Sequence, residues 1–342
     1  MLYSKDRMAI QNTAGFWPVA AAVVGNAAVM VGKFAAALAS GSSSMFSEAV
    51  HSLADTLNQA LLLVGLRRSL KKADESFEYG YGRERFFWAL ISACGIFFVG
   101  AGITAYHGIT SFIHPEPVEF TPLVFGVLLF ALAVESYTFY IAASALRRSF
   151  PGAAWLERLS RADPMTLSVY LEDAVAVAGV CIAALAIGAS YYTGNPHWDA
   201  GGSVVISLFL AATAVTLIMK NRSYLLGRAI PEDLQDEVVK LLEAEPAIEK
   251  VIDFKSSVLG WGVYRIKCEV EWNGGALLRE AYKRRSMKEQ FEEVRGDFGE
   301  FKRFLADYAD QIPRLMGKKI DEIEKRIREK HPTIWHIDIE IN

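Results

Sequence analysis

The stretch Gly15–Leu38 reads GFWPVAAAVVGNAAVMVGKFAAAL, and it decides the class of fold. At about 1.5 Å per residue, a helix of this length crosses the roughly 30 Å hydrocarbon core of a bilayer. Its polar side chains are Asn26 and Lys33, too few for the polar stripe that a helix of a soluble protein exposes to water. The stretch therefore predicts a transmembrane helix rather than a buried helix of a large soluble protein.

Further apolar stretches of similar length follow within the first two-thirds of this 342-residue chain. Hydrophobic residues make up 52% of the whole sequence and concentrate in this part. The predicted spans cover residues 15–38, 44–66, 86–110, 121–145, 165–190 and 199–220. We therefore expect a membrane α-helical bundle with six transmembrane helices, formed by residues 1–227.

The distribution of basic residues predicts how this bundle is oriented. The connections 40–44, 111–121 and 191–197 contain no lysine or arginine, whereas the alternate connections are rich in both. By the positive-inside rule, both termini are then cytoplasmic. The N-terminal residues lack the patterns of a signal peptide and of an Arg-rich transit segment, so the expected location is a prokaryotic plasma membrane.

Charge and cysteine content exclude other classes of function. A net charge of −3, without a basic face of one sign, does not suit nucleic-acid binding. The cysteines Cys94, Cys181 and Cys268 lie too far apart in the sequence to suggest a disulfide framework or a Cys-x-x-Cys site. We expect these three residues to serve in packing.

The composition changes after Arg228, where the long apolar stretches end. The pattern then predicts a helix at 231–243, a β-hairpin of 250–259 and 261–272 joined at Gly260, and a last strand at 333–341. A helix, two strands, a helix and a strand outline a small α+β domain at residues 228–342. We expect this domain to be cytoplasmic, because it follows the last positively flanked span.

Residues 274–314 exceed what so small a domain needs. Within them, Arg279–Lys302 mixes both signs of charge and has no apolar stripe wide enough for a core. We expect this charged insertion to be a solvated helical excursion or an oligomer contact.

Ionisable side chains interrupt the second predicted span. Glu48, His51 and Asp55 are spaced by three and four residues, which places them on one face of a helix. Such groups are costly at membrane depth and usually mark an ion pathway. Because an imidazole and carboxylates together suit a divalent metal, we expect a metal site rather than a lone structural histidine.

The fifth predicted span carries a second acidic pair, Glu172 and Asp173. Counted along their helices from the same side of the membrane, Asp173 lies about 15 Å deep and Asp55 about 18 Å deep, so both fall near the midplane. Neighbouring residues point about 100° apart around a helix. Asp173 is therefore the expected ligand, and Glu172 is a secondary candidate.

Three more polar residues lie inside predicted spans. Asn26 and Glu135 come at a similar depth, which makes them candidates for supporting the ligands or handling protons. An ordinary interhelical hydrogen bond is the alternative for both. Lys33 lies nearer the outer end, and we expect its side chain to snorkel toward the interface.

This chemistry predicts a transporter driven by proton exchange. A metal needs neutral imidazole and ionised carboxylates, so metal and protons compete for one site. A site that faces the two sides of the membrane in turn then gives antiport. Imidazole with oxygen donors favours Zn²⁺, while Mn²⁺, Fe²⁺ and Co²⁺ remain open.

The segment SSSMFSEAVHSLAD at Ser42–Asp55 resembles the second span of the cation diffusion facilitator family. The segment FEYGYGR at Phe77–Arg83 is similar to that family's loop before the third span. The resemblance implies a homodimeric exporter that exchanges Zn²⁺ or a similar divalent ion for protons, with a ferredoxin-like C-terminal domain. Zinc is then the transported substrate, and no cofactor is expected.

Carried over by position, the resemblance implies a transport site of His51, Asp55 and Asp173. The family often has a histidine four residues before the fifth-span Asp, where this chain has Val169. Glu172, Glu48 or water is expected to replace that ligand. A Glu-Asp pair at this place is similar to the branch that contains the mitochondrial zinc exporters of animals.

The last strand offers His336 and Asp338, which match a cytoplasmic metal pair of some family members. The other positions that would supply histidines hold Ile252 and Lys267. A regulatory metal cluster is therefore not expected there.

Two other functions compete with transport. An intramembrane zinc hydrolase could use the same residues to activate water, but its usual His-Glu-x-x-His cue is absent from the sequence. A transport-inactive scaffold or dimer partner, acting through the charged insertion, is the other alternative, because the expected histidine is missing at Val169.

Overall fold

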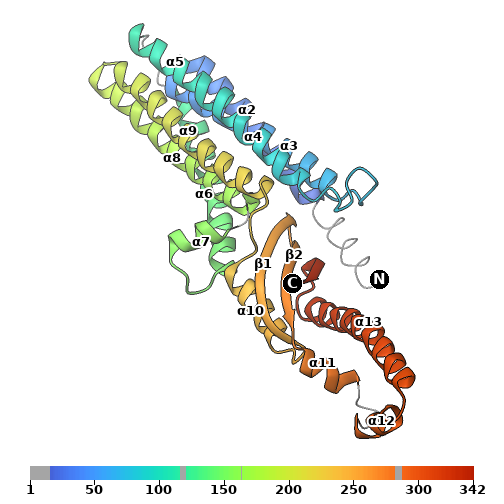
Figure 1. Ribbon diagram of the computed structural model, residues 1–342. Coiled ribbons are helices and arrows are strands. Elements are labelled where there is room, and N and C mark those ends of the chain that lie inside the picture. Colours follow the sequence, from blue (N-terminus) through green and yellow to red (C-terminus); the bar gives the residue numbers. More distant parts are fainter. Residues whose placement is uncertain (1–15, 116–120, 163, 282–286) are drawn as a thin grey trace. The chain divides into compact units, whose positions relative to one another are not determined.

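A computed structural model describes residues 16–115, 121–162, 164–281 and 287–342. The chain divides between Leu225 and Leu226 into two compact units (Figure 1). The first is helical, and the second combines helices with a small sheet.

Long helices that run side by side build the first unit (Figure 1). They are α2 (Phe16–Ser40), α3 (Ser43–Ser69), α4 (Glu84–Gly95), α5 (Gly102–Ile113), α6 (Pro122–Ser149), α8 (Pro164–Thr193) and α9 (His197–Leu225). A π-helical segment, η1 (Ile96–Ala101), joins α4 to α5 without a break, and the short helix α7 (Trp155–Arg161) follows α6.

Among the residues that the structure describes, four helical segments are long and apolar enough to cross a membrane, and each matches one of the predicted spans. They are Glu84–Ile113, Val124–Ser149, Thr166–Thr193 and His197–Leu225. Asn26–Ser40 is a shorter apolar helix among the described residues. The remaining helix, α3, is 27 residues long but too polar to qualify. The helical bundle is therefore confirmed, whereas the number of six spans is not confirmed by the described residues.

The polarity of α3 follows from which face it buries. Its buried residues include Ser47, Glu48, His51, Asp55 and Asn58, whereas Leu57 is 51% exposed. A helix that turns polar groups inward and apolar groups outward fits a lipid surrounding better than water. Its low mean hydropathy is thus compatible with a place in the bundle.

Small residues let the helices of this unit approach closely. A Cβ added at Gly202 of α9 would lie 2.5 Å from the Cβ of Ala186 on α8, so the two backbones touch there. Gly41, at φ 64°, ends α2 and allows the immediate turn into α3.

The second unit contains a three-stranded sheet in the order β1-β2-β3. Strand β1 (Ile248–Gly260) pairs antiparallel with β2 (Val263–Trp272), which pairs in parallel with β3 (Ile334–Ile341). The expected hairpin is confirmed, but its turn lies at Trp261–Gly262 rather than at Gly260, because Gly262 supplies the positive φ of 66°.

Helices α10 (Glu232–Glu243) and α13 (Phe298–Lys330) pack on this sheet. Together they bury an apolar core whose members include Val238, Leu242, Ile266, Ile323 and Ile327. The predicted order of a helix, two strands, a helix and a strand is therefore confirmed.

The charged insertion folds as α11 (Gly274–Ala281), α12 (Met287–Val294) and the first half of α13. Its expected end at Arg314 falls inside α13, which continues without a break into the part that packs on the sheet. Pro313 lies within this helix.

Candidate metal centre

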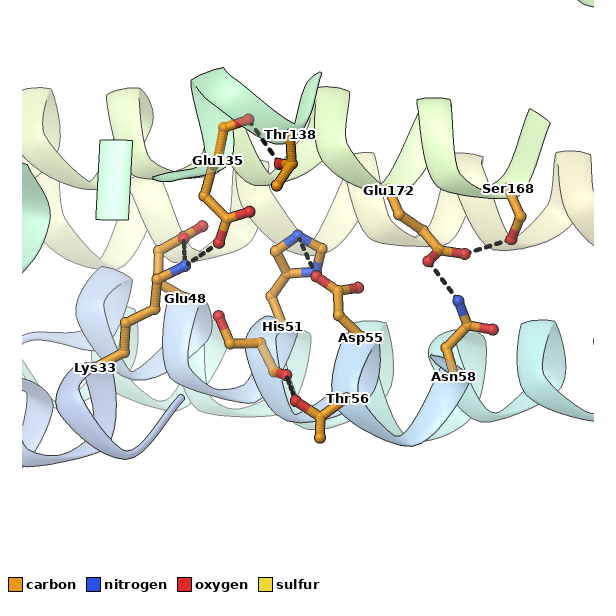
Figure 2. A network of polar contacts seen from close by, with 11 residues as sticks. Lys33, Glu48, His51, Asp55, Thr56, Asn58, Glu135, Thr138, Ser168 and Glu172 are labelled. Carbon is orange, nitrogen blue, oxygen red and sulfur yellow. Dashed lines mark hydrogen bonds and ion pairs between the residues drawn. The ribbon is translucent and has the colours of Figure 1, made fainter. Parts of the chain in front are cut away.

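Polar side chains from four helices form a row inside the first unit (Figure 2). Helix α3 supplies residues along the whole row, and α2, α6 and α8 supply their partners in its two outer parts. The members fall into three groups along α3: Lys33, Glu48 and Glu135; His51 and Asp55; and Asn58, Glu172 and Ser168.

His51 and Asp55 are the central pair. The Nε2 atom of His51 lies 3.5 Å from Oδ2 of Asp55, and the residues are 1% and 8% exposed. Both ring nitrogens of His51 and Oδ1 of Asp55 lack a hydrogen-bond partner within the described part of the chain. Because each buried polar atom without a partner costs about 1–3 kcal/mol, these atoms are suited to hold a cation.

Lys33 and Glu48 form a buried ion pair beside them. Lys33 Nζ lies 3.0 Å from Glu48 Oε2 and 3.4 Å from Glu135 Oε1, and both Lys33 and Glu48 are 0% exposed. The expectation that Lys33 snorkels to the interface is therefore wrong. Its two partners hold the ammonium inside the bundle, so its charge needs no contact with water.

Glu48 was a candidate ligand, and its carboxylate is confined on two sides, although Oε1 has no hydrogen-bond partner among the described residues. Its Oε2 accepts the hydrogen bond from Lys33, and its Oε1 packs so tightly against Gly179 of α8 that a Cβ there would collide with it. The carboxylate is thus engaged by α2 and pressed against α8.

Glu172 and Asp173 face different helices, as their angular offset predicts. Glu172 is buried and accepts hydrogen bonds from Asn58 on α3 and Ser168 on its own helix. Asp173 is less buried and lies beside Thr138 on α6. Each carboxylate oxygen of Glu172 therefore already accepts one hydrogen bond, and Asp173 is turned toward another helix.

The structure brings together some of the candidates but not all. Asp55 lies within electrostatic range of Glu135, Glu172 and Asp173. Even so, among the residues that can be described, no three His, Cys, Asp or Glu side chains approach closely enough to hold one metal ion. Within the described part of the chain, His51 and Asp55 thus lie together without a third side chain that would complete a metal-binding group.

Two other positions named from the sequence lie apart from this pair. Asn26 is half-buried on α2, seven residues before Lys33. Val169, at the position where the family often has a histidine, is 41% exposed.

In the C-terminal unit, a cation occupies the carboxylate of Asp338. Arg265 donates to Asp338 Oδ2 from Nε at 3.1 Å and from Nη2 at 2.8 Å. Burial and the charge of Arg265 lower the pKa of His336. The guanidinium thus engages Asp338 Oδ2, one of the oxygens that a metal at this pair would use.

Asn58 and Asp199 take part in this architecture, although the sequence reasoning did not select them. Asn58 continues the spacing of Glu48, His51 and Asp55 by three residues, and this stripe was the signal that could have identified it. It accepts a hydrogen bond from Ser92 of α4 and donates one to Glu172.

Asp199 of α9 fixes the start of α3. Its carboxylate accepts hydrogen bonds from Ser42 Oγ at 2.7 Å, from the backbone N–H of Ser43 at 2.6 Å and from Ser44. The backbone N–H groups of Ser43 and Ser44 belong to the first turn of α3. N–H groups in the first turn have no hydrogen-bond partner within their own helix. Sequence alone cannot assign such a cap, because Asp199 lies more than 150 residues away along the chain.

Comparison with known proteins gives several relatives along most of the chain. It is 36% identical over 315 residues to the proton-coupled zinc antiporter SLC30A9, mitochondrial, of Mus musculus, which covers 90% of this chain and 55% of that protein. The human protein of the same name is 35% identical over 314 residues, with the same coverage. Metal tolerance protein C4 of Arabidopsis thaliana is 34% identical over 316 residues, covering 90% of this chain and 69% of that protein.

These relatives correct the expected location. The proteins with 34–36% identity come from animals and a plant, and the SLC30A9 proteins are mitochondrial by name. The prokaryotic plasma membrane predicted from the sequence is therefore wrong, and the description of the termini and the C-terminal domain as cytoplasmic falls with it. The positive-inside rule ranks the two sides of a membrane but does not identify the membrane.

The family of the chain is set by its first unit. The model of the cation efflux transmembrane domain matches residues 19–226, which include α3, α6 and α8 with the His51–Asp55 pair. The relatives are transporters rather than enzymes, as expected. The chain spans about half the length of the SLC30A9 proteins it matches, at 55%. With the helical bundle and the small sheet domain, this match shows that the chain belongs to the cation efflux, or cation diffusion facilitator, family.

Proposed function

We propose that this chain exports Zn²⁺ across a membrane in exchange for protons, with His51, Asp55 and Asp173 as the metal ligands. The observation that carries the proposal is the buried His51–Asp55 pair, three of whose polar atoms have no hydrogen-bond partner among the described residues. Relatives named as proton-coupled zinc antiporters support the choice of ion and of coupling.

Proton exchange follows from the ligand chemistry. His51 binds metal only as neutral imidazole, and Asp55 and Asp173 bind it as carboxylates. Metal capture therefore expels protons, and protonation releases the metal. Imidazole with two carboxylates is a common ligand set for Zn²⁺, while Mn²⁺, Fe²⁺ and Co²⁺ are the competing substrates.

Capture needs the third ligand to approach the pair. Asp173 stands beside Thr138 of α6, whereas Glu172 of the same helix is bonded to Asn58 of α3. We infer that a movement of α8 against α3 carries Asp173 to His51 and Asp55 when metal enters. Alternating access then consists of making and breaking this three-residue site from opposite sides of the membrane.

The setting of the transporter is proposed from its relatives. Because the SLC30A9 proteins are mitochondrial by name, we propose an organellar membrane of a eukaryotic cell. The homodimer implied by the family resemblance is part of the same proposal.

Reconstituted vesicles test this function directly. Vesicles that hold a zinc dye and a pH dye should report Zn²⁺ uptake and a simultaneous opposite movement of protons. Asp55→Asn, which keeps the shape of the side chain but not its charge, should abolish both fluxes. Glu329→Gln, at an exposed site in the C-terminal unit, is the matched control and should transport normally.

The same experiment can reject the proposal. Zinc and proton fluxes that persist in Asp55→Asn, or a wild-type protein that moves neither ion, would contradict it. Gel filtration in detergent checks that each variant remains folded.

A further inference from the structure

Lys33 is a cation buried beside a proposed metal site. Its ammonium is 0% exposed, and it lies within electrostatic range of both His51 and Asp55. A fixed positive charge there repels a divalent metal ion. A lysine at this position is therefore unfavourable for metal binding unless it has another effect on the site.

Stability alone does not explain this lysine. Burying a lysine and its counter-ions is expensive, and apolar residues of similar volume usually hold helices together as well or better. Alanine, valine and leucine already form the core of this bundle. Lys33 therefore has an effect that an apolar side chain would not have.

What Lys33 does is to engage carboxylate oxygens. Glu48 Oε2 lies 3.0 Å from its Nζ, and Glu135 Oε1 lies 3.4 Å from it. Glu48 is one helical turn from His51 on the same face of α3, and Glu135 lies within electrostatic range of Asp55. Without the lysine, two further carboxylates would be available next to the His51–Asp55 pair.

The number of available oxygens influences which metal a site prefers. Zn²⁺ is satisfied by about four ligands and accepts imidazole readily. Harder ions such as Mn²⁺ and Ca²⁺ favour about six or more ligands, mainly carboxylate, carbonyl and water oxygens. Withholding two carboxylates thus favours Zn²⁺ over the harder ions.

We propose that Lys33 determines metal specificity by holding Glu48 and Glu135 away from the transported ion. This inference rests on the proposed function, since it assumes that His51 and Asp55 bind the cargo. Lys33 is in this sense an internal cation that occupies the oxygen ligands a harder metal would use.

The test compares Zn²⁺ and Mn²⁺ transport in vesicles. Lys33→Gln removes the ammonium and frees both carboxylates, so the ratio of Mn²⁺ to Zn²⁺ flux should rise at least about fivefold. Lys33→Arg, which keeps a cation in place, should leave the ratio near that of the wild type.

A triple variant separates specificity from mere loosening of the bundle. Lys33→Gln/Glu48→Gln/Glu135→Gln loses the lysine and also the carboxylates that it releases, so it should return to the wild-type ratio. If the triple variant has the same raised ratio of Mn²⁺ to Zn²⁺ flux as Lys33→Gln, the inference is overturned. An unchanged ratio in Lys33→Gln would overturn it as well.

Two further comparisons keep the test decisive. If Lys33→Gln does not fold, Lys33→Gln/Glu48→Gln takes its place, and this variant frees Glu135 alone. A raised ratio of Mn²⁺ to Zn²⁺ flux then supports the inference, and an unchanged ratio overturns it. A wild-type protein that moves no metal contradicts the proposed function itself. Wild-type Zn²⁺ transport with an unchanged ratio in the variants contradicts the role of Lys33 alone.

Discussion

Gly179 decides how closely the Glu48 carboxylate can pack against α8. Any Cβ at this position would collide with Glu48 Oε1. Glu48 in turn is fixed by its ion pair with Lys33, so it cannot move away cheaply. Because Gly179 has no Cβ, α8 can pack against α3 while the Lys33–Glu48 ion pair stays intact.

We predict that Gly179→Ala destabilises the bundle by about 1–3 kcal/mol, as overpacking in a filled interior does. Gly188→Ala is the control on the same helix, because a Cβ there meets nothing within 4 Å. Thermal unfolding in detergent should give a lower midpoint for Gly179→Ala and an unchanged or higher one for Gly188→Ala. Equal midpoints in the two variants would refute the packing argument.

Cys268 leads to a prediction about alkaline pH. Its thiol is 1% exposed, and burial, with the nearby carboxylates of Asp338 and Glu324, raises its pKa to about 12. An unfolded chain ionises this thiol near pH 8.5, at about its ordinary pKa. The folded state therefore keeps a proton that the unfolded state loses, and stability is lost as the pH rises from about 9 toward 12.

Cys268→Ala removes this contribution. The wild type should be more stable than the variant at neutral pH, and the difference in melting temperature should shrink above about pH 9. A difference that stays constant from pH 7 to pH 10.5 would show that the thiol does not titrate on unfolding.

The residues of the candidate metal site differ in how far the sequence could predict them. The stripe of Glu48, His51 and Asp55 lies within one helix, so spacing alone places it on one face. The partners of Lys33 lie on α3 and α6, and Glu135 is 102 residues away along the chain. Spacing within a helix carries no information about its neighbours. The ion pair between Lys33 and Glu48 could therefore not be predicted from the sequence.

Helix α3 depends on a neighbour for its N-terminus. Asp199 of α9 accepts bonds from Ser42, Ser43 and Ser44, and it is 1% exposed. The helix that carries His51 and Asp55 is therefore fixed against α9 at its N-terminus and bonded to Glu172 of α8 through Asn58, just past its middle.

Asp199→Ala should destabilise the protein by at least about 2 kcal/mol, because it leaves several buried donors without an acceptor. Asp199→Asn retains one acceptor oxygen and should lose less. The comparison is Thr121→Ala, which removes one bond to Val124 N at the start of α6 and should cost about 1 kcal/mol. Unfolding midpoints that do not follow this order would contradict the role given to Asp199.

Among the elements, patterns with a clear period were predicted correctly, and their boundaries were less so. The hairpin and α10 emerged from alternation and from Pro231, since both signals are local. The hairpin turn moved by two residues because Gly262 rather than Gly260 takes the positive φ. Helix α3 was predicted as the span 44–66, and its buried polar face accounts for its low mean hydropathy.

The chain as a whole consists of two units with separate cores. In the second unit, α10, the sheet and α13 share a single apolar core, in which Ile323 is 1% exposed. A core of this kind, complete within residues 226–342, should support independent folding.

We predict that residues 226–342 fold when expressed alone and unfold cooperatively in urea, as followed by circular dichroism. Within this fragment, Ile323→Ala should cost about 2–5 kcal/mol, because it leaves a cavity. Lys325→Ala, on the exposed side of the same helix, should change stability by less than about 0.5 kcal/mol. A fragment without a cooperative transition would mean that the unit depends on the helical bundle.

The Lys33–Glu48 pair also bears on how the protein is made. A lysine disfavours membrane insertion of a helix by roughly 2.5–3.5 kcal/mol at the centre and by less toward an end, so Lys33 weakens the insertion of α2 on its own. Glu48 follows only 15 residues later, on the next helix. Biogenesis should therefore proceed through an α2–α3 hairpin whose opposite charges neutralise each other before either helix meets lipid.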